Sequence, residues 1–452
     1  MHLQELSWSD TPLARYDALR TLPWPLLLDS QSAGRFDILV ADPLATSWLD
    51  DDGWHHTGWP GCAGDAFAVM AALQAWGQSR LQVSDRPALT ADWPLHAGVL
   101  GYLGYATPGE QGLPARRGDD WPLAAFGFYD RGCVYDHETR RCHAWADGRL
   151  DDAAWQAWLD ALAGPATSTP AFRLQASFRA LTPRDRYAAD IARIHDFIRA
   201  GDCYQVNYTQ AWEARHDGSL WPVYPILRDL ARGPYGAFWQ LPWGELLSLS
   251  PEQFLGVSDG RVTTRPIKGT RRRHAEAEAD WQEACQLENS IKDRAENVMI
   301  TDLLRNDLAK HAVTGSVRVP QLCALESFGQ VHHLVSTVTA DLRPDAGVAD
   351  LLRDAFPGGS ITGAPKKRVM EIIETLEPVA RGVYCGSLVM WDVSGRLDSS
   401  ITIRTLVSRD GLLRTWAGGG ITLDSQWEAE HQECWNKMGR IIEALERLSP
   451  SA

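Results

Sequence analysis

The order of helix-like and strand-like segments after residue 171 most constrains the fold of this chain. Apolar residues at helical spacing predict helices over 184–200, 281–311 and 366–376. A capping-box pattern that starts at Ser425 predicts one more helix near the C-terminus. Strand-like runs lie between these helices in no regular alternation, at 246–249, 384–391, 400–406 and 412–417. This mixture predicts an α+β fold in which helices cover sheets, because a parallel α/β fold would alternate the two elements regularly.

A stretch of small residues and prolines divides the chain into two regions. It covers residues 164–171 and is typical of a linker. We therefore expect an N-terminal region over 1–164, a linker over 165–179 and a catalytic region over 180–449. Short strand-like segments among turns rich in glycine and proline are expected in the N-terminal region.

The composition excludes several classes of protein. The 452 residues carry a net charge of -14, which argues against general nucleic-acid binding, because that needs a basic face. No apolar run approaches the roughly 18 residues that span a membrane. The N-terminus lacks the basic and apolar segments of a signal peptide. The 8 cysteines form no Cys-x-x-Cys pair, so we expect a protein of the reducing cytoplasm.

The segment FPGGSITGAPK at 356–366 is locally the most informative. Its glycines let the backbone approach a ligand, and the helix that follows begins with Lys366, Lys367 and Arg368. Cations oppose the dipole of a helix N-terminus, but its free N–H groups bind anions, so a docked anion would explain the cations. The alternative is a solvated basic turn after a glycine loop.

Three glutamates are candidate metal ligands. Glu296 lies beside an apolar helical stripe, and the three-residue spacing of Glu430 and Glu433 places them on one helix face. Carboxylate oxygens are the hard ligands that Mg²⁺ prefers. Ordinary surface carboxylates, with Glu433 paired to Lys437, give the same pattern.

Lys268 stands alone in the segment PIKGT at 266–270, where proline and glycine restrict the backbone. A lysine acts as a nucleophile when burial or nearby cations lower its pKa from ~10.4 toward ~7–8. Arg265 and Arg271 are candidate cations. The alternative is a turn lysine in a basic loop.

Taken together, the segments resemble the motifs of the chorismate-utilising enzymes, which include component I of anthranilate synthase and of aminodeoxychorismate synthase, and the isochorismate and salicylate synthases. One segment would be a weak signal, whereas the collinear set is specific. The matching segments are GDCYQVN 201–207, LSPEQF 249–254, PIKGT 266–270, KDRAEN 292–297, DLLRND 302–307, HHLVS 332–336, FPGGSITGAPK 356–366, SITIRT 400–405, GGGIT 418–422 and EHQE 430–433. The resemblance implies two large, mainly antiparallel sheets stacked face to face, with helices outside and the site in a cleft between the sheets.

Two positions distinguish branches of this family. Members that add water carry a basic lysine where this chain has Gln205, and members that add ammonia resemble this chain in having glutamine. Anthranilate synthases have alanine at the third position of PIxGT, and aminodeoxychorismate synthases have lysine, as Lys268 is here. The pair resembles the aminodeoxychorismate synthases, which implies amination of chorismate at C4 for the synthesis of 4-aminobenzoate and folate.

The resemblance also implies a role for each site residue. Lys268 attacks C2 of the ring and displaces the C4 hydroxyl, Glu252 protonates that hydroxyl as general acid, and ammonia then adds at C4 and expels the lysine. Mg²⁺, held by Glu296 and Glu433 with Glu430 close by, binds the ring carboxylate. The residues expected to contact the substrate are Thr362, Lys366, Arg404, Gly418, Gly419, Gly420 and His333.

No glutaminase segment is visible in the chain, so the resemblance implies that a separate glutamine amidotransferase subunit supplies the ammonia. The N-terminal segment LPWPLLLDS at 22–30 resembles the segment that forms a tryptophan pocket in relatives, here through Leu28, Asp29 and Ser30. It departs from the Leu-Leu-Glu-Ser pattern of feedback-inhibited anthranilate synthases.

Two alternatives remain. The first is anthranilate synthase component I, which shares nearly every segment and which Lys268 argues against. The second is a tryptophan-binding regulatory protein on the same scaffold. The intact residues Glu252, Glu296, Glu433 and Lys268 argue against that second alternative.

Overall fold

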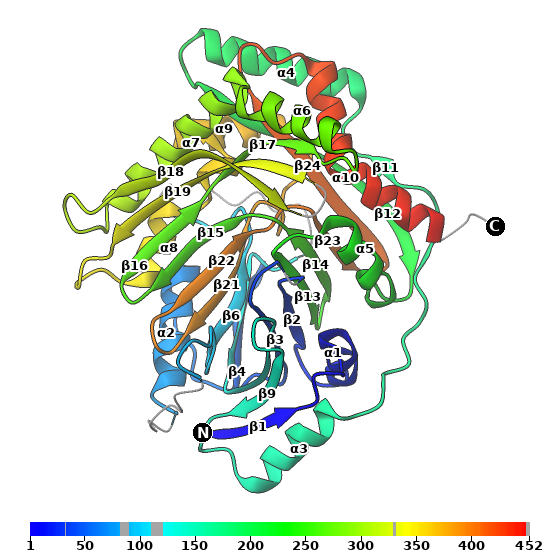
Figure 1. The fold of residues 1–452 in the computed structure, drawn as a ribbon, viewed down its shortest axis with the longest axis vertical. Helices are drawn as coiled ribbons and strands as arrows, with labels where there is room; N and C mark the ends of the chain where they lie inside the picture. Colours follow the sequence, from blue (N-terminus) through cyan, green and yellow to red (C-terminus); the bar gives the residue numbers. More distant parts are fainter. Residues whose placement is uncertain (32, 82–89, 110–120, 329–330, 449–452) are drawn as a thin grey trace.

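Two large β-sheets form the centre of the computed structural model, which describes residues 1–31, 33–81, 90–109, 121–328 and 331–448 (Figure 1). The first sheet has 13 strands and the second has 11. The strand pairs of the described residues are antiparallel, so each sheet can carry one face toward the core and one toward helices or solvent.

The first sheet combines strands from both ends of the chain. Its β2 pairs with β13, where Leu28 lies opposite Ala237. β11 and β20 pair with β12 off the main path. The strands, in spatial order, are β1 His2–Leu6, β9 Arg141–Ala146, β8 Arg131–Asp136, β3 Phe36–Val40, β2 Leu26–Asp29, β13 Tyr235–Leu241, β14 Gly244–Ser250, β23 Thr405–Arg409, β24 Leu412–Ile421, β12 Gln205–Asp217 and β10 Arg173–Leu174, with β11 Arg179–Ala180 and β20 Gly363–Ala364 beside β12.

The second sheet mixes early and late strands in the same way. Figure 1 shows β6, in cyan, beside β21, in orange, and the two strands are paired. β18 pairs with β19 off the main path. The strands are β17 Ile267–Arg272, β19 Val331–Asp341, β16 Arg261–Arg265, β15 Gln253–Ser258, β22 Leu397–Ile401, β21 Ser387–Asp392, β6 Gly98–Leu103, β7 Ala124–Tyr129, β4 Ala45–Asp50 and β5 Gly53–Thr57, with β18 Arg318–Phe328 beside β19.

Helices lie on the outer faces of the sheets (Figure 1). α7 contacts β17, β18 and β19, α2 contacts β6 and β7, and α10 contacts β24. The helices are α1 Pro12–Leu19, α2 Ala66–Gln78, α3 Asp152–Leu162, α4 Arg184–Arg199, α5 Tyr224–Ala231, α6 Ala277–Glu288, α7 Ile291–Ala309, α8 Val348–Ala355, α9 Lys366–Leu376 and α10 Trp427–Leu448, with 3₁₀ turns η2 Trp221–Val223 and η3 Gly359–Ile361. Within the described residues, none of them has the length and apolarity that a membrane span requires.

Aromatic side chains join the inner faces of the two sheets. Tyr102 of β6 meets Trp239 of β13 edge-on, with ring centroids 6.0 Å apart, and both side chains are fully buried. Trp24 packs between Trp48 and Trp239 at 6.2 and 5.8 Å. These contacts place one hydrophobic core between the sheets. The predicted α+β fold of two large antiparallel sheets with helices outside is therefore confirmed.

Strands from the predicted N-terminal region pair with strands from the predicted catalytic region. Strands from before and after the linker share both sheets and one core. The division at 1–164, 165–179 and 180–449 stays a prediction about the sequence, and residue 449 lies outside the described residues.

Three local predictions are corrected by the structure. The helix expected over 281–311 is two helices, because Ser290 accepts a hydrogen bond from the backbone N–H of Asp293 and starts α7 afresh. The strand expected over 400–406 is the end of β22 and the start of β23, with Arg404 between them at φ 51°. α10 begins at Trp427, and Ser425 Oγ donates to Glu430 Oε1 at 2.7 Å, which differs from the expected capping box.

Candidate active site

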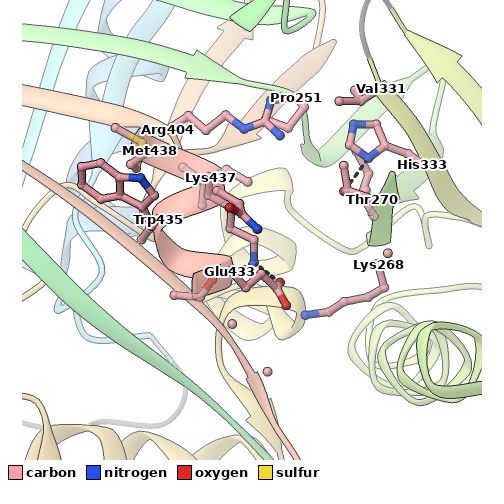
Figure 2. A pocket seen from close by; sticks show the side chains of 18 of the residues that line it. Pro251, Lys268, Thr270, Val331, His333, Arg404, Glu433, Trp435, Lys437 and Met438 are labelled. Carbon is pink, nitrogen blue, oxygen red and sulfur yellow. Dashed lines mark hydrogen bonds and ion pairs between the residues drawn. The ribbon is translucent and has the colours of Figure 1, made fainter. Parts of the chain in front are cut away.

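A cavity of about 930 Å³ opens between the two sheets (Figure 2). β17 and β19 of the second sheet form one wall, β24 of the first sheet forms another, and α7, α10 and η3 close the rest. The predicted site residues that line it are Glu252, Lys268, Glu296, His333, Arg404, Gly418, Gly419, Gly420 and Glu433. Segments that are far apart in the sequence thus meet at one place.

Lys268 and Glu252 meet at a single residue of η3. The ammonium of Lys268 donates to the backbone carbonyl of Ser360 at 2.8 Å, and the Ser360 side chain is hydrogen-bonded to Glu252. The backbone N–H of Ile267 also donates to Glu252 Oε1, at 3.5 Å. Ser360 therefore interacts with both the lysine and the carboxyl group.

Burial shifts the pKa of both groups toward their neutral forms. It lowers the pKa of the Lys268 ammonium below its usual value, although the carboxylates of Glu296 and Glu252 act in the opposite direction. It raises the pKa of Glu252, against the hydrogen bond from Ser360 and the charge of Lys268. A neutral amine is a nucleophile and a protonated carboxyl is an acid, so this pair suits a step that needs both.

Gln205 lies behind the cavity wall, at the start of β12. Its Nε2 donates to Glu296 Oε2 at 3.1 Å. Gly420 lies against this contact: a Cβ there would overlap the Gln205 amide and lie 3.3 Å from Glu296 Oε2. The absence of a side chain at Gly420 therefore lets the amide and the carboxylate meet.

The three predicted metal ligands differ in their surroundings. Glu296 lies in the cavity wall, and its pKa is raised by burial first, with Asp293 and Glu433 adding to the effect. The charge of Lys437 lowers the pKa of Glu433, because Lys437 Nζ lies 2.7 Å from Glu433 Oε1. Glu430 is buried beside the cavity and accepts from Lys292 Nζ at 3.0 Å.

His333 and Arg404 line the part of the cavity that lies above Glu433 and Lys268 in Figure 2. Burial, followed by the charge of Arg404, lowers the pKa of His333 to about 3, so its ring is neutral at physiological pH. Thr270 Oγ1 lies 2.9 Å from His333 Nδ1 and fixes the ring orientation. A neutral ring beside a guanidinium suits a flat, anionic ligand.

Two predicted substrate residues lie outside the cavity lining. Thr362 is fully buried, and its hydroxyl donates to the carbonyls of Gly358 and Gly359, so it shapes the glycine turn. Lys366 is buried, and its ammonium donates to Asp307 Oδ2 at 2.8 Å and to the carbonyl of Ala355 at 2.7 Å. The structure thus places the Lys366 charge in an internal ion pair, away from the anion that the sequence suggested.

We expect Lys366→Met to destabilise the fold by about 3–5 kcal/mol, because it leaves the buried Asp307 carboxylate without this ammonium. Chemical denaturation monitored by tryptophan fluorescence measures this loss. The control is Lys367→Met, at an exposed position one residue along α9, which should change the free energy of unfolding by less than about 0.5 kcal/mol. Equal stabilities of the two variants would contradict this role for Lys366.

Three residues that the sequence analysis did not assign to the site also shape it. Lys437 donates to the carbonyl of Gly418 at 2.8 Å as well as to Glu433, so it joins α10 to the glycine strand. Ser360 carries the contacts to Lys268 and Glu252, and Tyr384 lines the cavity. The four-residue spacing of Glu433 and Lys437 was the available signal for Lys437. Ser360 and Tyr384 are recognised only from the folded structure.

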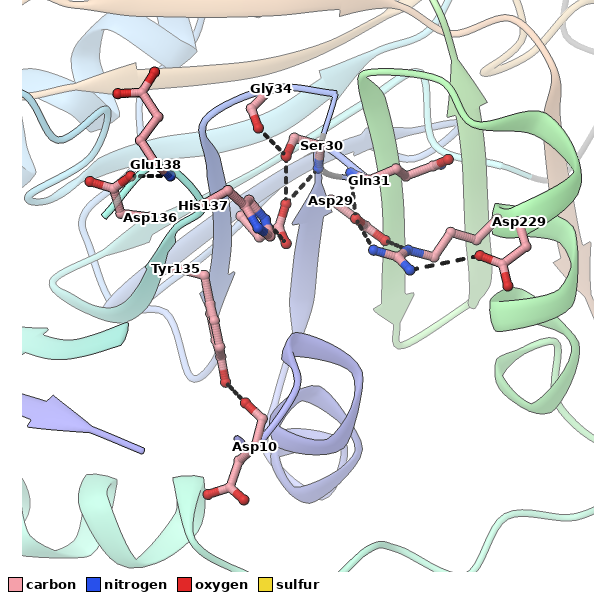
Figure 3. Close-up of polar contacts among 12 residues, drawn as sticks. Asp10, Asp29, Ser30, Gln31, Gly34, Tyr135, Asp136, His137, Glu138 and Asp229 are labelled. Carbon is pink, nitrogen blue, oxygen red and sulfur yellow. Dashed lines mark hydrogen bonds and ion pairs between the residues drawn. The ribbon is translucent and has the colours of Figure 1, made fainter. Parts of the chain in front are cut away.

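A second cavity, of about 230 Å³, is lined by the predicted tryptophan-pocket residues Leu28, Asp29 and Ser30. Asp29 accepts from Arg228 Nη2 at 3.1 Å, and the hydroxyl of Ser30 donates to Asp37 at 2.8 Å. Figure 3 shows these contacts as part of a polar network beside β2. The three residues thus border a cavity, and tryptophan binding there stays a prediction.

Comparisons with known proteins cover nearly the whole chain. The sequence model of the chorismate binding enzyme matches residues 26–443. Aminodeoxychorismate synthase component 1 of Klebsiella aerogenes is 43% identical over 441 residues, which are 95% of this chain and 96% of that protein. The Salmonella typhimurium protein of the same name is 42% identical over 451 residues, 98% of this chain and 97% of that protein.

A solved structure shares the fold. The crystal structure of anthranilate synthase component I from Streptococcus pneumoniae has a TM-score of 0.78 and 27% sequence identity. It covers 90% of this chain and 92% of that one. The similarity of fold therefore extends over most of both chains.

Proposed function

Because the chain belongs to the chorismate binding enzyme family, we propose that it aminates chorismate at C4, as component I of an aminodeoxychorismate synthase. The chain is an enzyme, and two relatives that match 95% and 98% of its length carry that name. The observation that carries the proposal is the meeting of Lys268 and the buried Glu252 at Ser360.

In the proposed reaction, the neutral amine of Lys268 attacks C2 of the chorismate ring. The double bond shifts, and the C4–O bond breaks. Glu252 donates its proton to the departing hydroxyl, which leaves as water; a hydroxyl is otherwise a poor leaving group. Ammonia then attacks C4, the double bond shifts back, and the C2–N bond to Lys268 breaks.

Gln205 supports ammonia rather than water as the second nucleophile. Its amide is held by Glu296 and does not titrate near neutral pH, so it cannot serve as the base that would activate a water molecule. Ammonia needs no such base, because neutral ammonia is a much stronger nucleophile than neutral water. We propose that the positive charge of Arg404 and the neutral ring of His333 orient the substrate.

We propose Mg²⁺ as the cofactor. Within the described residues, no group of three or more His, Cys, Asp or Glu side chains is assembled as a metal cluster. Mg²⁺, however, keeps several waters and often takes only one or two carboxylates. Glu296 and Glu433 fit that requirement, because both line the cavity and the charge of Glu433 raises the pKa of Glu296. Bound there, Mg²⁺ would supply positive charge to a substrate carboxylate.

We expect Mg²⁺ at 100 times its dissociation constant to stabilise the wild-type fold by about 2.7 kcal/mol, and to stabilise Glu296→Gln much less. Thermal unfolding with and without Mg²⁺ measures the effect without relying on activity. Glu428→Gln, at an exposed position of α10, is the matched control and should respond like the wild type. Equal stabilisation of Glu296→Gln and wild type would place the ion elsewhere.

We propose that a glutamine amidotransferase subunit delivers the ammonia in the cytoplasm. The relatives are named component 1, which supports a second component. The 8 cysteines form no Cys-x-x-Cys pair, which supports a reducing compartment.

The test is to incubate the purified chain with chorismate, Mg²⁺ and ammonium at mildly alkaline pH, and to identify the product by mass and fluorescence. The proposal predicts an aminated product that keeps its enolpyruvyl group and yields 4-aminobenzoate only after a lyase is added. Anthranilate and pyruvate would instead assign the chain to the anthranilate synthases, whose fold it shares. Stabilisation by tryptophan without turnover of chorismate would favour a regulatory protein that uses the second cavity.

A further inference from the structure

A buried guanidinium lies directly behind the wall of the cavity. Arg381 follows α9 in the chain, and its side chain is 1% exposed. Its N–H groups donate to both carboxylate oxygens of Glu377, at 2.7 and 2.9 Å. They also donate to the carbonyls of Ile361, at 2.8 Å, and Asn207, at 2.6 Å. The guanidinium lies 4.4 Å from the centre of the Tyr105 ring.

These contacts join two segments that form the site. Ile361 ends the η3 turn, and Asn207 belongs to β12, two residues after Gln205. Glu377 extends the connection, because its Oε1 also accepts from the backbone N–H of Thr209 in β12 at 2.9 Å. Arg381 therefore fixes η3 against the first sheet.

The residue next to Ile361 carries the contacts of the proposed reaction. The carbonyl of Ser360 accepts from Lys268, and its hydroxyl is bonded to Glu252. Lys268 is in β17 of the second sheet, and Glu252 directly precedes β15 of the same sheet. The distance between Ser360 and this pair therefore depends on how firmly η3 is held to the first sheet.

Stability alone does not account for a charge at this position. Replacing a buried ion pair by apolar side chains of similar volume is often neutral or stabilising. Arg381, however, uses the planar fork of its guanidinium to reach one carboxylate and two backbone carbonyls in different directions. A lysine ammonium cannot reproduce that geometry.

We infer that Arg381 is a positioning residue, which holds η3 so that the carbonyl and the hydroxyl of Ser360 meet Lys268 and Glu252. The inference rests on the proposed function, because it assigns Arg381 to the step that Lys268 and Glu252 perform. Arg381 acts through Ser360 and does not itself line the cavity.

The test compares Arg381→Lys with the wild type in the ammonia-dependent assay. We expect kcat to fall by about 10- to 100-fold, because a small misplacement of reacting groups has effects of that size. KM for chorismate should change by less than about threefold, since Arg404 and His333 stay in place. The high-pH limb of the kcat profile should move to higher pH, because the bond from Ser360 lowers the pKa of Glu252 and would be weakened.

Two further variants keep the test decisive. Tyr105→Phe is the matched control: it keeps the ring beside Arg381, and the tyrosine hydroxyl has no hydrogen-bond partner among the described residues, so kcat should not change. Glu377→Gln removes the negative charge that the Arg381 guanidinium binds, and so weakens the same interaction. It should shift the high-pH limb in the same direction even if Arg381→Lys fails to fold. Circular dichroism and thermal unfolding identify the folded variants.

The outcomes separate this inference from the proposed function. Wild-type kcat and an unshifted pH limb in folded Arg381→Lys, or in Glu377→Gln, would overturn the positioning role while the amination reaction stands. A wild-type chain that forms no aminated product would overturn the proposed function before any variant is compared, and the inference with it.

Discussion

Lys268→Ala lowers the formation of 4-amino-4-deoxychorismate by about 10³-fold or more, if the lysine is the covalent nucleophile of the proposed reaction. Alanine has no group that can attack C2, and direct attack of ammonia at C4 would have to expel the hydroxyl without the intermediate. The cavity explains why a lysine can serve, because burial lowers the pKa of its ammonium and makes the neutral amine more abundant. The measurement is the rate of product formation at saturating ammonium.

Lys367→Ala is the matched control for this prediction, since it removes an exposed lysine and should leave the rate unchanged. A second readout tests the covalent step itself. Without ammonia, wild-type protein incubated with chorismate should gain the mass of chorismate less one water, and peptide mapping should place this mass on Lys268. Full activity of folded Lys268→Ala would exclude the covalent mechanism, whatever the product.

The motifs in the sequence are enough to name the proposed reacting groups, because each group lies in a short segment to which the family resemblance assigns a role. Lys268 in PIKGT and Glu252 in SPE could be singled out without coordinates. The resemblance predicted two stacked antiparallel sheets, and the strand pairs confirm that architecture. It also placed Leu28, Asp29 and Ser30 at a pocket, and they do border a cavity.

Contacts between distant segments could not be predicted in this way. The sequence places Lys366 at a helix N-terminus, where an anion was a reasonable partner, but the partner is Asp307, 59 residues away. Ser360 meets Lys268 across 92 residues, and Arg381 reaches Asn207 across 174. Such pairs depend on how the two sheets pack, which local spacing does not encode.

A local hydrogen bond and a local backbone conformation explain why two predicted boundaries of helices and strands were wrong. The apolar stripe over 281–311 continues through Ser290, so periodicity alone predicts one helix. The Ser290 side chain bonds the backbone N–H of Asp293, however, and a new helix begins there. At Arg404 the apolar run 400–406 continues, but the left-handed backbone ends the strand and carries the guanidinium to the cavity.

Glu252→Gln should lower kcat by about 10²- to 10⁴-fold, the range expected for loss of a general acid. Glutamine keeps the size and polarity of the side chain but has no proton to donate to the C4 hydroxyl. Burial raises the pKa of Glu252, so its acid form persists to higher pH than that of an exposed glutamate. Wild-type kcat should therefore fall as pH rises through this raised pKa.

The shape of the pH profile distinguishes an acid from a residue that only binds substrate. Glu252→Gln should lose the high-pH limb, because glutamine does not titrate, whereas a binding residue would change KM and leave the limb in place. Glu252→Asp should keep the limb and recover part of the rate, since it restores a carboxyl group at a longer distance from the ring. The control is Glu428→Gln, which alters an exposed carboxylate of α10 and should reproduce the wild-type profile. Retention of the high-pH limb in folded Glu252→Gln would assign the acid to another group.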